Sequence, residues 1–317
     1  MSKFDPFAHL NIKLNEDGTL SRLAKFPNKD ANPEPAPGDP IATKDCTINN
    51  TFLRIFIPTV VLRSNSTTTT RLPIVFYLHG SSWILFDAAN VAAYVTCTRH
   101  ACEIPAIIIV PNCRLAPEHR IPTQYDDAVE AVLWVKQQAL DPNGERWLKE
   151  YGDFSRCYLH GSGSGGNIVF NVALRVNDMD LKPLKIVGLI MNQPLFGGKQ
   201  RTKSELKFAT DQMMPLPVLD LIWELALPKG ADRDSPYCNP TVDGPHKSKL
   251  RLLQRCLVIG FSKDPLIDRQ QSFVEMLMMS GVKVDAQFDD MGFHRIELVD
   301  KRWAAALLQM VKEFILN

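Results

Sequence analysis

The sequence lacks the long apolar runs that a signal peptide or a membrane-spanning helix requires. Its first residues, MSKFDPFAHLNIKLNEDG, contain no apolar core of the length found in signal peptides. No later window approaches about 18 uninterrupted apolar residues. We therefore expect a soluble, cytoplasmic protein without a membrane partner. The two glycosylation triplets, which begin at Asn49 and Asn65, are expected to be chance matches.

The sequence also lacks an excess of charge of either sign and any paired cysteine motif. There are 36 Lys and Arg residues against 35 Asp and Glu residues, and no basic stripe with interleaved aromatic residues, which argues against a nucleic-acid partner. The seven cysteines are scattered, and none belongs to a C-x-x-C pair. They are predicted to be reduced packing residues, and we expect neither a metal nor a cofactor.

What the sequence does have is an alternation of strand-like and helix-like segments. Its 317 residues allow one large α/β domain or two small ones. Short apolar runs such as LPIVFYLHG, AIIIVPNCRL and CLVIGFSKDP alternate with helical patterns such as YDDAVEAVLWVKQQA and RWAAALLQMVKEFI. This alternation predicts a mostly parallel sheet with helices on both faces. The polar tract RSNSTTTTR, residues 63–71, is predicted to be a solvent-facing turn between two strands.

Two segments fall outside this alternation. Residues 1–45 are rich in Pro, Asn and Asp, as in FPNKDANPEPAPGDP, a composition that sustains neither a helix nor a central strand. They are predicted to form an N-terminal arm that contributes to a cap. Residues 200–240 carry the extra apolar helical stretch DQMMPLPVLDLIWELALP. We predict that this stretch is a cap insertion over the carboxyl ends of the strands, where open α/β sheets bind ligands.

Five motifs, in their order and spacing, make the sequence similar to a known family. The segments FYLHGSSWILF, NCRLAPEHRIPTQYDDAVEAVLWV, HGSGSGGNIVFNVALR, GFSKDPLID and DDMGFH resemble those of the plant carboxylesterases of the hormone-sensitive-lipase group. The similarity runs over nearly the whole chain. It implies that residues 1–317 form a single α/β-hydrolase domain, with a central, mostly parallel sheet, helices on both faces and a small helical cap.

The resemblance also implies which residues form the site. That family carries an HGGG oxyanion loop, a GxSxGG nucleophile elbow, an acid in a DPLxD segment and a histidine in a GFH segment. The acid and the histidine are intact as Asp264 and His294. The loop reads HGSS over residues 79–82, and the elbow serine aligns with Gly163 when the flanking glycines are in register.

A glycine at the apex of the elbow removes the nucleophile. Gly163 tolerates the strained strand-to-helix turn but supplies no oxygen. Moving the frame so that Ser162 or Ser164 takes its place breaks the match to the flanking glycines. We expect hydrolytic turnover to fall by about 10⁶-fold relative to an intact site, by comparison with nucleophile knockouts. A remnant on the order of 10³ over water could survive through binding and oxyanion stabilisation.

The remaining groups suit proton transfer. His294 is predicted to act as general acid or base, with Asp264 fixing its tautomer and stabilising its protonated form. Backbone N–H groups and hydroxyls are predicted to form the oxyanion hole, from Gly80, Ser81, Ser82 and Ser164. Large apolar side chains are predicted to contact the substrate, namely Trp83, Met213, Met214 and Trp223. The last three suit the core equally well, and His160, on the strand before the elbow, is expected to be packed rather than catalytic.

Three functions stay open at this point. The favoured one is an enzyme that has kept the esterase pocket, has given up hydrolysis, and eliminates or cyclises a small molecule such as an alkaloid intermediate. The resembling family includes such dehydratases and cyclases of plant specialised metabolism. The second is a carboxylesterase for small esters, with Gly163 engineered or bypassed. The third is a small-molecule receptor like the gibberellin receptors of the family, although these keep the elbow serine and lose the histidine. Substrate identity and oligomeric state are left open.

Overall fold

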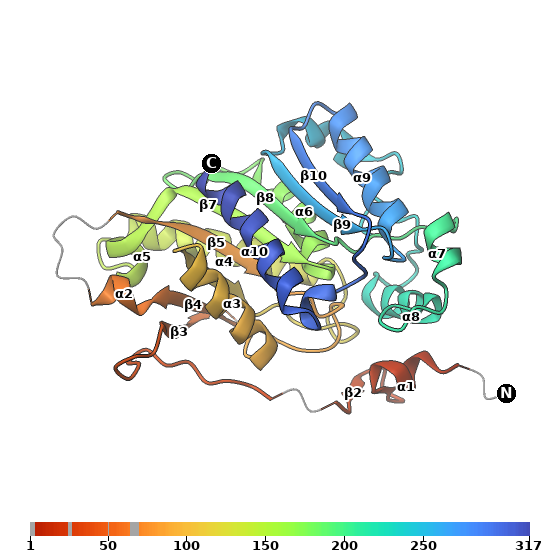
Figure 1. Ribbon diagram of the computed structural model, residues 1–317, viewed down its shortest axis with the longest axis horizontal. Coiled ribbons are helices and arrows are strands. Elements are labelled where there is room, and N and C mark those ends of the chain that lie inside the picture. Colours follow the sequence, from red (N-terminus) through yellow and green to blue (C-terminus); the bar gives the residue numbers. More distant parts are fainter. Residues whose placement is uncertain (1–3, 25–26, 50, 64–69) are drawn as a thin grey trace.

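The computed structural model describes residues 4–24, 27–49, 51–63 and 70–317, and an eight-stranded sheet runs through its centre (Figure 1). The strands lie in the order β10-β9-β8-β7-β5-β6-β4-β3. Their bounds are β3 (Ile41–Ile48), β4 (Thr51–Pro58), β5 (Leu72–Leu78), β6 (Ile107–Pro111), β7 (Gly152–Ser162), β8 (Ile186–Asn192), β9 (Cys256–Phe261) and β10 (Val284–Asp289). Neighbours from β10 to β6 pair in parallel, whereas β4 pairs antiparallel with both β6 and β3. The sheet is therefore mostly parallel with an antiparallel edge.

The central strands are apolar because the sheet is covered on both faces. Every residue of β5, β6 and β9 is buried. Successive side chains of a strand point to opposite faces, so Ile74 and Phe76 enter one hydrophobic core while Val75 and Tyr77 enter the other. In contrast, the second half of the edge strand β3 alternates between exposed positions and positions that are at least partly buried.

Two helices cover one face of the sheet, and four cover the other (Figure 1). The first face carries α3 (Val91–Glu103) and α10 (Lys301–Leu316). The opposite face carries α4 (Thr123–Leu140), α5 (Arg146–Tyr151), α6 (Ser164–Val176) and α9 (Ile267–Met279). Further short helices are α2 (Thr59–Leu62), η1 (Pro245–Leu252) and η2 (Ile296–Leu298). The α3/α10 face and the α4/α6/α9 face thus enclose separate cores.

The N-terminal residues meet the 200–240 segment. Helix α1 (Pro6–Leu10) begins where Phe7 N donates to Asp5 Oδ1 at 2.9 Å, and it contacts α8 (Leu216–Ala226). Strands β1 (Ile12–Leu14) and β2 (Leu20–Arg22) then form an antiparallel hairpin. The helices within residues 200–240 are α7 (Lys203–Lys207) and α8. The function of both segments as a cap stays a prediction.

The sheet type predicted from the sequence is confirmed, but the strand order was not predicted. Strands β4 and β5 follow one another in the chain, yet β6 lies between them in the sheet. Strands β3 and β10 were missed, and β10 has no buried residue that would mark it as apolar. Most of the tract predicted as a turn, residues 64–69, lies outside the described residues. Across the described ranges, no helix combines the length and the apolar character needed to cross a membrane.

Candidate active site

The turn between β7 and α6 has the form of a nucleophile elbow with an empty apex. Gly163 adopts φ 58° and ψ −120°, a conformation that L-residues rarely adopt. Gly163 N donates to Asn192 O at 2.9 Å, and Leu195 N donates to Gly163 O at 2.9 Å, so the apex peptide is tied to the end of β8. A Cβ built on Gly163 would meet no atom within 4 Å. The apex therefore has room for a side chain but carries none.

The flanking glycines are required by close backbone packing. A Cβ on Gly161 would overlap the backbone of Gly165, and a Cβ on Gly165 would overlap the carbonyl oxygen of Leu78 in β5. Gly166 lies against Pro194, where a Cβ would come within 3.0 Å. These contacts fix the alignment of the motif around Gly163 because none of the three positions admits a side chain without backbone movement.

The hydroxyl groups of the serines on either side of the apex already accept hydrogen bonds. Ser162 Oγ accepts from Asn192 Nδ2 at 3.0 Å and from Arg295 Nη1 at 3.0 Å. Ser164 Oγ accepts from Ser81 N at 3.2 Å. Both residues are buried. Neither hydroxyl occupies the apex, and no hydrogen bond joins either of them to His294 among the described residues.

The structure brings Asp264 and His294 together from loops that follow β9 and β10. His294 Nδ1 lies 2.8 Å from Asp264 Oδ2, and both side chains are buried. Asp264 also accepts hydrogen bonds from Leu266 N at 2.8 Å and from Gln270 Nε2 at 3.1 Å, so its two oxygens are held in place. His294 Nε2 has no hydrogen-bond partner in the described part of the chain. The pair thus has an oriented imidazole with one ring nitrogen available for proton transfer.

The loop after β5 approaches the elbow closely. A Cβ on Gly80 would overlap the carbonyl oxygen of Ser162, so this position also requires glycine. Ser81 N, predicted to stabilise an oxyanion, donates to Ser164 Oγ, so a substrate oxygen would have to compete with that hydroxyl. Ser82 adopts a positive φ of 53°. His79 is buried with no partner for either ring nitrogen in the described residues, and burial lowers its pKa to about 4.

The four predicted substrate contacts occupy different environments. Trp83 and Trp223 are both 2% exposed, with ring centroids 4.8 Å apart, and they belong to the core on the α4/α6/α9 face. Met214 is 8% exposed and joins the same core, whereas Met213 is 40% exposed. Their contact with a substrate stays a prediction.

Sequence reasoning missed the residues that support the site. Gln270 holds Asp264, and Gln193 Oε1 accepts from Arg295 N at 2.6 Å, directly after His294. Gln270 is on α9, six residues after Asp264, where the first turns of the helix face back toward the acid. That spacing was a usable signal for Gln270. No local pattern linked Gln193 to residues 102 positions away in the chain.

The comparisons with known proteins agree with this geometry. The model of a family described as having the alpha/beta hydrolase fold matches residues 75–298. The chain belongs to this α/β-hydrolase family. It is 53% identical to "Probable carboxylesterase 9" of Arabidopsis thaliana, over 98% of this chain and 97% of that protein.

Two further matches concern the sequence and the fold of this α/β-hydrolase. It is 46% identical to a 3-O-acetylpapaveroxine carboxylesterase of Papaver somniferum, over 89% of this chain and 93% of that protein. An esterase structure from Pyrobaculum calidifontis superposes with a TM-score of 0.70 at 22% identity, covering 86% of this chain and 84% of that one. The chain is therefore carboxylesterase-like, and the distant structure supports the fold alone.

Proposed function

We propose that this carboxylesterase-like chain is an enzyme that eliminates or cyclises a small molecule by proton transfer, without an acyl-enzyme intermediate. The observation that carries the proposal is the combination of an apex without a side chain at Gly163 and a buried, hydrogen-bonded Asp264–His294 pair. A nucleophilic mechanism needs the missing oxygen, whereas general acid–base catalysis needs only the pair.

His294 would perform the transfer at Nε2. With Nδ1–H donated to Asp264, neutral Nε2 accepts a proton from the substrate while the electrons of the broken bond expel a leaving group or form a ring. The imidazolium, stabilised by the Asp264 carboxylate, then returns the proton to the departing oxygen in an elimination, or to the substrate atom that gains the electron pair when the ring closes. A positioned acid or base of this kind contributes about 10²–10⁴-fold to the rate. Holding a flexible substrate in one folded conformation adds several kcal/mol.

Hydrolysis of small esters is the second candidate, favoured by the names of the relatives and by the space at the apex. Ser162 and Ser164 are poor substitutes for the missing nucleophile, because each hydroxyl already accepts a hydrogen bond and neither is hydrogen-bonded to His294 in the described residues. The space beside Gly163 instead indicates that a side chain restored at that position would fit.

The first experiment separates the two candidates. The unmodified chain, Gly163→Ser and Ser164→Ala are treated with a fluorophosphonate probe and assayed with a short-chain aryl ester. We expect no covalent labelling of the unmodified chain or of Ser164→Ala, and labelling with at least 10³-fold more ester turnover in Gly163→Ser. Labelling of a serine in the unmodified chain would overturn the proposal in favour of hydrolysis.

The second experiment tests the role of His294. A plant metabolite extract is incubated with the unmodified chain, with His294→Ala and with a control variant, His119→Ala, which changes an exposed histidine. We expect one mass peak to be converted by the unmodified chain and the control, with conversion at least 10²-fold slower in His294→Ala. A compound that binds all three proteins and is never converted would indicate a receptor instead.

A further inference from the structure

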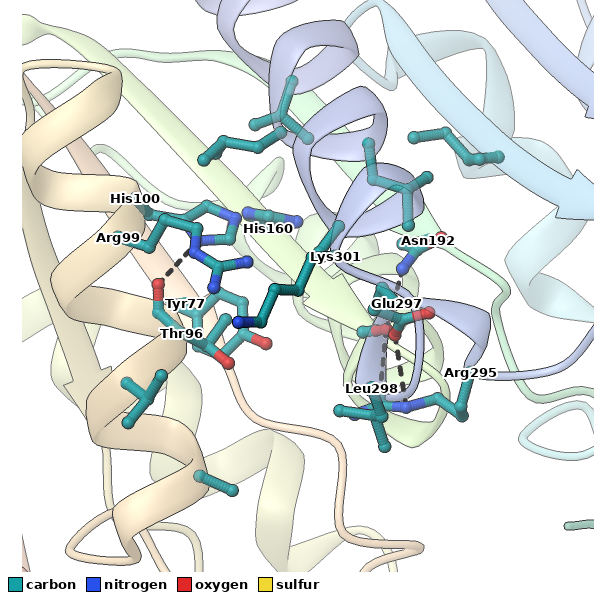
Figure 2. A pocket seen from close by; sticks show the side chains of 18 of the residues that line it. Tyr77, Thr96, Arg99, His100, His160, Asn192, Arg295, Glu297, Leu298 and Lys301 are labelled. Carbon is teal, nitrogen blue, oxygen red and sulfur yellow. Dashed lines mark hydrogen bonds and ion pairs between the residues drawn. The ribbon is translucent and has the colours of Figure 1, made fainter.

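A cavity of about 450 Å³ lies on the α3/α10 face of the sheet (Figure 2), and its lining includes Ser162 and Arg295, the chain neighbours of Gly163 and His294. Its floor is made by side chains of four neighbouring strands, Tyr77 of β5, His160 of β7, Asn192 of β8 and Ile259 of β9. Its walls are α3, α10 and residues 295–299 before α10. Neither Gly163 nor the Asp264–His294 pair lines it. Its volume falls within the range of about 300–1,000 Å³ that is typical of small-molecule sites.

Most of the wall is apolar and reaches the surface. The apolar wall residues are Val91, Ala92, Val95, Leu298, Val299, Ala304, Leu307, Leu308 and Val311. Val95 on α3 is 53% exposed and Val299 is 69% exposed, so part of the mouth of the cavity is apolar, and the exposed side chains of Arg99 and Lys301 form another part. Such a rim favours the entry of a molecule with an apolar body.

The polar part of the floor holds groups without partners. His160 is 3% exposed, and its Nδ1 has no hydrogen-bond partner in the described residues. The hydroxyl of Tyr77 likewise has none there, although its ring packs edge-on against His160 at a centroid distance of 5.1 Å. His160 Nδ1 is closed to solvent, so a ligand would meet another part of the His160 ring, whereas the Tyr77 hydroxyl is open to a hydrogen bond from a ligand in the cavity.

Two positively charged side chains that form no ion pair in the described residues lie near these groups. Arg99 of α3 and Lys301 of α10 line the cavity, and Figure 2 shows their charged ends extending toward one another. Neither forms an ion pair with any residue that the structure describes. The third cation, Arg295, lies at the other side of the pocket and is paired with Glu297 at 3.3 Å. The pocket therefore has an excess of positive charge at the end next to Tyr77 and His160.

We propose that the α3/α10 cavity is a second ligand site, which binds an organic carboxylate with an apolar body. The apolar body lies between α3 and α10, and the carboxylate lies between Arg99 and Lys301, with the Tyr77 hydroxyl and the His160 ring in reach. The required occupant combines one negative charge with an apolar chain or ring system. This site does not depend on the reaction proposed above.

Isothermal titration of the full chain with octanoate tests the charge requirement, with 1-octanol as the uncharged probe. We expect octanoate to bind the unmodified chain more tightly than octanol. In the double variant Arg99→Gln/Lys301→Gln, the affinity for octanoate should fall at least tenfold, and the affinity for octanol should change less than threefold. Lys312→Gln, on the same helix α10 but outside the cavity, is the matched control and should leave both affinities unchanged. The proposal would be overturned if Lys312→Gln lost as much octanoate affinity as the double variant, or if the double variant lost none.

A second pair of variants locates the apolar body. Ala304 lines the cavity, whereas its neighbour Ala305 is exposed and does not. Ala304→Phe should fill part of the cavity and lower the affinity for both octanoate and octanol at least tenfold. Ala305→Phe should leave both affinities unchanged.

A third variant separates the two sites. His294→Ala should retain octanoate binding even where it abolishes turnover. If octanoate binding is lost in His294→Ala but retained in Ala304→Phe, the ligand binds at the Asp264–His294 site. That result would refute this inference without affecting the proposed reaction.

Discussion

At the scale of single residues, the site keeps the acid–base pair of a serine esterase but lacks its nucleophile. Gly163 keeps the backbone conformation of an elbow but offers no oxygen, while His294 keeps its hydrogen bond to Asp264. The conformation survives because the neighbouring peptide groups hold it and because glycine accepts a positive φ at little cost. The orientation of the imidazole survives because its hydrogen bond to Asp264 does not involve residue 163.

Burial of His79 should make the stability of the protein depend on pH. Burial lowers its folded-state pKa to about 4, whereas an unfolded histidine titrates near 6.5, so the unfolded state binds a proton more readily. The free energy of unfolding should therefore fall as pH drops from about 6.5 to about 4, with no contribution from this residue above about 7. At pH 5 the loss from His79 should be about 2 kcal/mol.

Urea unfolding at pH 7.5 and pH 5 measures this effect. The loss of stability between the two pH values should be smaller by about 2 kcal/mol in His79→Phe than in the unmodified chain. His119→Phe removes an exposed histidine and should leave the difference unchanged. An identical pH dependence in His79→Phe and the unmodified chain would contradict the expected titration.

At the scale of elements, the glycines mark where β7, α6 and β5 come into backbone contact. The sequence allowed α6 and β7 to be predicted from their periodicity, and the motif placed the turn between them. It did not show why each glycine is needed. Gly165 faces Leu78 in β5, which is far away in the chain, whereas Gly163 faces open space. Only the pairing of β5 with β7 distinguishes the two positions.

Alanine substitution should distinguish these glycines. Gly165→Ala should lower the free energy of unfolding by about 4 kcal/mol or more, because its Cβ overlaps the carbonyl oxygen of Leu78 and a central strand must shift. Gly163→Ala should cost only about 1–3 kcal/mol, since the strain lies in φ alone. Chemical denaturation of both variants measures the difference, and equal losses would show that backbone overlap does not decide the position.

At the scale of the whole molecule, Arg22 ties the N-terminal residues to the rest of the chain. It donates from Nε to Ile84 O at 2.5 Å and from Nη2 to Ala116 O at 2.9 Å, and it pairs with Glu118 at 2.9 Å. These contacts join the β1–β2 hairpin to the loops after β5 and β6. The position of this segment therefore depends on the half-buried side chain of Arg22 as well as on α1 packing against α8.

Removing this connection should loosen the N-terminal segment before the rest of the protein unfolds. In Arg22→Gln we expect chymotrypsin to cut at the exposed Leu14 or Leu23 at least tenfold faster, since about 1–3 kcal/mol of local stability is lost. Arg146→Gln breaks an exposed pair with Glu150 and should change neither cleavage nor the free energy of unfolding by more than about 0.5 kcal/mol. Equal cleavage rates in the two variants would show that Arg22 does not hold the segment.

The sequence by itself determined the fold class, most of the central strands, the empty apex at Gly163 and the identity of the Asp264 and His294 partners. Each of these follows from local composition or from motifs with a fixed order. Only the tertiary structure decided that β6 lies between β4 and β5, that Gln270 and Gln193 support the site, and that a charged cavity lies between α3 and α10. Apart from the Gln270–Asp264 contact, which spans six residues, these features join residues that are far apart in the chain, and long-range pairing leaves no signal in a local pattern.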